Sequence, residues 1–140
     1  MSALTNYLES GLINHVFRNS AYSAPATLYI GLTQSFVSGT IEAGTVDEPA
    51  TGSYVRQSYI SNGTNWITPY TSGSATATHN TYAIEFPVAT ANIGNVSGVF
   101  LADDLSSGNI LFYGELLSPR NIREGDQFVF SSGALKIIFN

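Results

Sequence analysis

The chain has 140 residues, of which 44% are hydrophobic and only 11% charged, and its formal net charge is −5. Ordinary soluble domains carry roughly 25% charged residues, so uncharged polar groups or protein partners must cover much of this surface. With five Lys and Arg in total, the chain cannot neutralise a run of phosphates, and we expect no nucleic acid and no membrane as partners. The absence of cysteine excludes disulfides and thiolate chemistry.

Residues 2–18 predict an α-helix at the start of the chain. Ser2 is placed to cap it, and Arg18 stands near its end, where a cation suits the helix dipole. Apolar residues recur every four positions along it and form one stripe: Leu4, Leu8, Leu12 and Val16. Ile13 and Phe17 fall beside that stripe, so the helix is either covered on two sides by the core or in contact with a partner.

The pattern then changes from a helical to a strand period. Residues 27–35 and 53–60 are rich in β-branched and aromatic side chains and predict two strands. Residues 36–53 predict a long loop, and residues 62–80 predict a second polar connection. Five more strands are predicted near residues 82–86, 96–102, 109–116, 127–130 and 134–139.

Short strands about 10–15 residues apart, with turn-forming residues between them, are typical of antiparallel sandwiches and jelly rolls. We therefore expect a mainly β fold, in which residues 27–139 form an antiparallel β-sandwich or jelly-roll-like structure. The N-terminal α-helix is the one helix expected, and residues 1–140 are expected to form a single domain.

No combination of residues predicts catalysis. His15 and His79 are far apart in the sequence and lack a zinc-binding spacing, and Ser97 lacks the glycine elbow of a nucleophile. One loop gathers oxygen ligands without the order of a calcium-binding loop: Asp103, Asp104, Ser107 and Asn109. We expect a protein that is not an enzyme and that has no cofactor and no metal.

The segment "GNILFYGELLSPRNIREGDQFVF", residues 108–130, places two arginines beside several acids. Phe112 and Tyr113 fall on opposite sides of its strand, which indicates a strand covered on both faces. Pro119 is predicted to end that strand. Arg120 and Arg123 are predicted to pair with one of the nearby acids and to stabilise a turn or a seam between subunits: Glu115, Glu124 or Asp126.

Six segments in this order resemble a known family: "YLESGLINHVFRNSAY", "LYIGLTQS", "GSYVRQ", "FPVATANIGNVSGVFLAD", "GNILFYGEL" and "NIREGDQFVFSSGALKI". The family consists of small virion proteins of tailed bacteriophages, labelled either as tail fibre or as head decoration proteins. The resemblance implies a structural subunit located in the virion and assembled in the host cytoplasm.

The chain is short and lacks the repeats of a fibre shaft, which favours a capsid decoration, or cement, protein. Such a protein would bind the major capsid protein as a homotrimer and tie neighbouring capsomers together. The alternative is a tail fibre or tail-tip adhesin that binds a host-surface glycan. On either interpretation, contacts are expected at Ile13, Phe17, Phe36, Tyr113, Arg120 and Arg123.

Overall fold

The computed structural model describes residues 2–140, which fold mainly as β-strands. The elements in chain order are β1 (Ser2–Leu4), α1 (Asn6–Phe17), β2 (Thr27–Thr33), α2 (Ser38–Glu42), β3 (Gln57–Ile60), β4 (Tyr70–Ser72), β5 (Ala75–His79), β6 (Ile84–Glu85), β7 (Gly94–Ala102), β8 (Ile110–Ile122), β9 (Val129–Phe130) and β10 (Lys136–Phe139). The strand pairs within this range are antiparallel. The predicted fold class, mainly β and antiparallel with an N-terminal helix, is confirmed.

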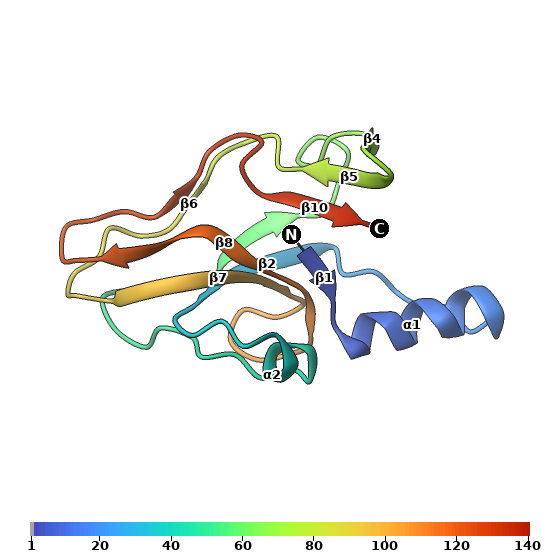
Figure 1. Ribbon diagram of the computed structural model, residues 1–140, viewed down its shortest axis with the longest axis horizontal. Coiled ribbons are helices and arrows are strands. Elements are labelled where there is room, and N and C mark those ends of the chain that lie inside the picture. Colours follow the sequence, from blue (N-terminus) through green and yellow to red (C-terminus); the bar gives the residue numbers. More distant parts are fainter. Residues whose placement is uncertain (1) are drawn as a thin grey trace.

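The strands form two layers. A five-stranded sheet in the order β1-β8-β7-β2-β3 is the larger layer, and the sheets β10-β5-β4 and β6-β9 make up the other. Figure 1 shows the two smaller sheets over one face of the larger one. The main core lies between the layers and joins buried side chains of both, among them Ile30, Leu32, Leu101, Phe86 and Ile137. This arrangement is sandwich-like.

A second, smaller core lies around Phe100, which is fully buried. Phe100 lies against Gly31 of the neighbouring strand β2, where an added Cβ would overlap its ring. Ile41 of α2 belongs to the same cluster and is buried. The predicted loop over residues 36–53 therefore contains a short helix that covers a core.

The start of the predicted helix is wrong. Ser2 does not cap it, because Ser2–Leu4 forms β1 and pairs with β8, Leu4 opposite Phe112. The helix begins at Asn6, and Thr5 is its N-cap. The edge of β8 offers β1 backbone partners, and that long-range pairing overrides a local pattern that favours helix.

The connection predicted over residues 62–80 is also wrong in part, because it contains the hairpin of β4 and β5. Ala75 and Ala77 are buried while Thr76 is exposed, which is the alternation of a strand. Gly73 in the turn has φ +65°, a conformation that glycine adopts readily. The alternating residues are small, so their hydrophobic signal was weak.

Candidate assembly surface

Helix α1 is fixed to the body of the molecule at its first turn. The Thr5 side chain caps the helix by accepting a hydrogen bond from the Leu8 N–H. The Thr5 hydroxyl also donates to the Ile110 carbonyl, and the Thr5 N–H donates to the Leu111 carbonyl at 3.0 Å. Thr5 is buried and Leu8 is the buried residue of the helix. The root of α1 is thus joined to β8 by backbone and side-chain bonds.

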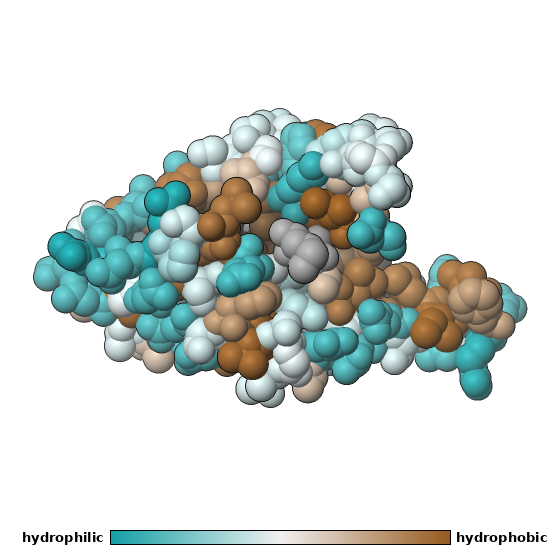
Figure 2. Space-filling model, viewed as in Figure 1, coloured by the Kyte–Doolittle hydropathy of each residue, from teal (hydrophilic) through white to brown (hydrophobic). Residues whose placement is uncertain are grey.

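Beyond its root, α1 projects from the body (Figure 1). Residues 12–20 are all exposed, and hydrophobic surface gathers over the projecting end (Figure 2). The exposed apolar side chains of the helix are Leu12 at 37%, Ile13 at 55%, Val16 at 66% and Phe17 at 81%. At about 100° per residue these four side chains span roughly 140° of the helix. They are called the α1 face below.

Another side of α1 is covered by its own chain. The ring of Tyr22 lies against Gly11, where an added Cβ would come within 2.8 Å of it. The Tyr22 N–H donates to Nδ1 of His15 at 3.2 Å. The returning segment therefore holds the Gly11 side of the helix and leaves the α1 face to solvent. The predicted core stripe is confirmed at Leu8 and wrong at Val16.

Strand β8 does not end at Pro119 but continues to Ile122. Its register against β7 shifts between Gly98, opposite Glu115, and Val96, opposite Arg120. Four residues of β8 therefore face a single residue of β7 and form a bulge, residues 116–119. Strand β1 covers the other edge of β8 only as far as Gly114. Pro119 is tolerated because it lies in a bulge beyond the cover of β1, where it interrupts no pairing with that strand.

The bulge borders a shallow hollow of about 680 Å³ between β8 and the segment before α2. Among its lining residues are Phe36, Tyr113, Glu115, Leu116, Leu117 and Pro119; this surface is called the β8 hollow. Leu117 is fully exposed, at 106%, and the rings of Phe36 and Tyr113 lie 6.1 Å apart. Burial and the nearby Glu42 raise the pKa of the Tyr113 hydroxyl. The hollow is hydrophobic, and Glu115 supplies the charge in its lining.

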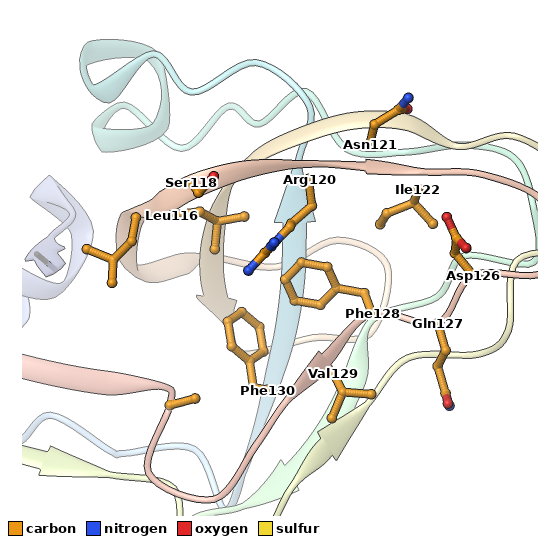
Figure 3. A pocket seen from close by; sticks show the side chains of 12 residues that line it. Leu116, Ser118, Arg120, Asn121, Ile122, Asp126, Gln127, Phe128, Val129 and Phe130 are labelled. Atoms are coloured by element: carbon orange, nitrogen blue, oxygen red, sulfur yellow. The ribbon is translucent and has the colours of Figure 1, made fainter.

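Arg120 lies in a different cleft, of about 570 Å³, between β8 and β9. Figure 3 shows its side chain pointing inward beside the rings of Phe128 and Phe130. Within residues 2–140 neither Arg120 nor Arg123 forms the predicted ion pair, and the salt bridge found joins Arg56 and Glu48. The pairing of Arg120 or Arg123 across a seam between subunits stays a prediction. Asp126 instead accepts a hydrogen bond from the Arg123 backbone N–H at 2.9 Å and closes the turn.

Arg56 joins separate segments of the fold through its guanidinium. The sequence alone did not predict this role. It is buried, and its Nε and Nη2 donate to both oxygens of Glu48 at 2.9 and 3.0 Å. Its Nη1 donates to the carbonyls of Asp104 and Ser107. The guanidinium also lies 5.0 Å from the centre of the Phe100 ring. The sequence places Tyr54 and Arg56 on one side of the strand predicted over residues 53–60. That strand starts at Gln57, so the predicted start is wrong and both residues lie in the segment before β3.

The residues considered for metal binding lie in other arrangements. His15 is on α1, and His79 lies in β5 with its ring 6.0 Å from that of Tyr70. Asp103 accepts hydrogen bonds from the backbone and side chain of Asn109 and so closes a turn. Among residues 2–140 no group of three or more His, Cys, Asp or Glu could hold a metal ion.

Comparison with known protein families places the whole chain in one family. The model of the family described as "Podophage GP4 fiber I protein gp80" matches residues 3–138, which is nearly the whole chain. The chain belongs to the fiber I family. A comparison with curated proteins finds no match.

Membership in the fiber I family confirms the resemblance to small bacteriophage virion proteins, under the fibre label. The protein is accordingly a structural protein of the virion. In the part of the chain that the structure describes, no helix is both long and apolar enough to cross a membrane. The α1 face and the β8 hollow are apolar surfaces that contain four of the residues predicted to make contacts: Ile13, Phe17, Phe36 and Tyr113. That they make such contacts stays a prediction.

Proposed function

We propose that the protein is a subunit of a bacteriophage fibre and that it acts by binding and assembly, not by catalysis. The observation that carries this proposal is the α1 face, a helix surface with Ile13, Val16 and Phe17 mostly exposed at its projecting end. Contiguous exposed apolar surface marks sites of protein contact. The match to a fibre family over residues 3–138 supports the same role.

Low charge suits such an assembly. Charged groups penalise an interface when they are buried without partners, and only 11% of this chain is charged. Closed symmetry repeats each contact in every subunit, so modest patches add up to firm retention. The proposed partners are other copies of the chain, as a homotrimer assembled in the host cytoplasm, and a neighbouring virion protein.

The short chain favoured a capsid decoration protein. The family description supports the alternative, a fibre protein. The two roles differ in copy number, because a decoration protein covers the shell whereas fibres are few. Purified virions separated on a quantified gel should therefore contain far fewer copies of this chain than of the major capsid protein. Gold-labelled antibody should lie at fibres in electron micrographs. Near-equal copy numbers and label over the whole head would reject the fibre proposal.

A glycan-binding role is a second candidate, favoured by the cleft between β8 and β9. Arg120 points into this cleft beside Phe128 and Phe130, with Asp126 also in the lining. Aromatic rings and planar polar side chains together can bind a sugar by stacking and hydrogen bonds. Arg120→Ala should weaken binding of the protein to host cells without lowering its stability. Equal binding by the Arg120→Ala and Arg123→Ala proteins would reject this role.

A further inference from the structure

The α1 face and the β8 hollow are two unpartnered apolar surfaces at different places on one chain. From their shapes and charges we infer that they bind each other between copies: α1 of one copy lies in the β8 hollow of the next. The inference deepens the proposed function, because it names the partner of the α1 face as a second copy of this chain. It concerns the isolated protein and can be tested without the virion.

The form of β8 favours a helix over a strand as the occupant of the hollow. An added strand needs a regular row of backbone partners, and here the bulge over residues 116–119 and Pro119 interrupt that row. A helix satisfies its own backbone groups and offers only side chains. The β8 hollow correspondingly presents side chains, with Leu117 fully exposed beside the rings of Phe36 and Tyr113.

The charges of the two surfaces are complementary. Arg18 follows Phe17 directly as the C-cap of α1 and is the charged residue of the projecting end, residues 12–20. Glu115 is the charged residue in the lining of the β8 hollow. Neither forms a salt bridge within residues 2–140. In the inferred contact, Leu117 packs among Ile13, Val16 and Phe17, and Arg18 pairs with Glu115 at the rim.

The contact uses different surfaces on the two copies and is therefore head-to-tail. Such a contact closes into a ring when its rotation divides a full turn, and otherwise extends as a filament. A homotrimer is the ring of three copies. In a closed ring each copy donates one α1 and accepts one, so neither the α1 face nor the β8 hollow remains open. The α1 face then needs no cover from its own chain.

A charge exchange tests the contact directly. Arg18→Glu should place two like charges at the rim and raise the dissociation constant of the oligomer about tenfold or more. Arg18→Glu combined with Glu115→Arg should restore association, measured by sedimentation of the purified protein. The matched control combines Arg18→Glu with Glu124→Arg, at an exposed acid outside the β8 hollow, and should not restore it. Equal behaviour of the two double variants would overturn the inference.

Cross-linking provides a second test, which is simple because the chain has no cysteine. A Phe17→Cys protein mixed with a Leu117→Cys protein of different size should form a mixed disulfide dimer on oxidation. Both changed side chains are exposed, so the fold should be unaffected. Phe17→Cys mixed with Val88→Cys, at an exposed site outside both surfaces, is the control and should give little product.

The outcomes separate this inference from the proposed function. The head-to-tail contact would be overturned if the protein stays monomeric, or if disulfides form only between two Phe17→Cys chains. Either result would leave the fibre role open. A head-to-tail oligomer from a chain that is absent from virion fibres would support the contact and reject the fibre role.

Discussion

At the scale of single residues, Arg56 is a buried charged group with hydrogen bonds to both Glu48 and a neighbouring loop. Its guanidinium bonds both oxygens of Glu48 and two carbonyls of the loop between β7 and β8. The Tyr54 hydroxyl donates to the same Glu48 at 2.8 Å and accepts from the Leu32 N–H. This network joins segments far apart in the sequence, and its loss should affect the whole fold.

We predict that Arg56→Gln lowers the free energy of unfolding by about 3–5 kcal/mol, because it leaves the Glu48 carboxylate partly buried without its cation. Urea unfolding measures the effect. Arg56→Met combined with Glu48→Met should cost less than the sum of the two single changes, since the pair acts as a unit. Arg123→Gln is the control, expected within about 0.5 kcal/mol of wild type. If Arg56→Gln lowered the free energy of unfolding as little as Arg123→Gln, the prediction would be contradicted.

The second residue-scale prediction concerns alkaline pH. Burial raises the pKa of the Tyr54 hydroxyl above its usual value of 10.0, and Glu48 adds to that shift. The folded protein therefore keeps a proton that the unfolded chain releases above about pH 10, so stability falls as pH rises. The slope reaches about 1.4 kcal/mol per pH unit for one such group.

Urea midpoints measured from pH 8 to 11 test this dependence. Tyr54→Phe should show a shallower decline than wild type, although its stability at pH 8 is lower. Tyr82→Phe, at a mostly exposed side chain, is the matched control. Parallel curves for wild type and Tyr54→Phe would show that the Tyr54 hydroxyl is not responsible.

At the scale of elements, α1 and β8 determine which surfaces are open. The first turn of α1 is bonded to β8 through Thr5, while the α1 face has no cover from its own chain. The bulge of β8 exposes Leu117 and leaves room for Pro119. The two elements are in contact at the first turn of α1 and then separate. The α1 face therefore lies on one element and the β8 hollow on the other.

We expect Thr5→Val to loosen α1, because the methyl group that replaces the hydroxyl can neither cap the helix nor bond the Ile110 carbonyl. The loss should be about 1–2 kcal/mol. Hydrogen exchange should accelerate in residues 6–17 more than in β7. Thr71→Val, at an exposed strand position, is the control. Unchanged protection of α1 would show that packing of Leu8 alone fixes the helix.

At the scale of the whole molecule, low charge governs how the protein associates. Its contacts are expected to be mostly apolar and hydrogen-bonded, with one charge pair at the rim of the inferred interface. Such contacts depend weakly on ionic strength, since salt screens exposed charges and leaves apolar burial intact. Association and retention in the virion should therefore resist salt.

We predict that the oligomer changes little between about 0.1 M and 1 M salt, where the screening length falls from about 10 to 3 Å. Ile13→Ser combined with Phe17→Ser should dissociate it at either salt concentration, because two of the four exposed apolar side chains of the α1 face are lost, including the most exposed one, Phe17. Val55→Ser with Val88→Ser, at other exposed apolar sites, is the control. Release of subunits at moderate salt would contradict an apolar interface.

The sequence by itself determined the fold class and the membership of the chain in a virion family. Alternating apolar residues and turn signals are local, so most strands could be predicted near their positions, as for Gly94–Ala102. The hairpin of β4 and β5 was missed because alanine gives a weak periodic signal. The exposure of Ile13 and Phe17 was anticipated as one alternative, since two apolar strips on one helix need more cover than one core face provides.

The tertiary structure alone decided which charged residues pair and which apolar surfaces stay exposed. Arg120 and Arg123 lie close in sequence to three acids, yet the salt bridge forms at Arg56, because the fold buries that residue beside Glu48. Because of strand pairing, residues 2–4 form β1 and not the start of the helix, and β8 continues beyond Pro119 to Ile122. Long-range backbone pairing and burial decide these outcomes, and neither is encoded in a local pattern.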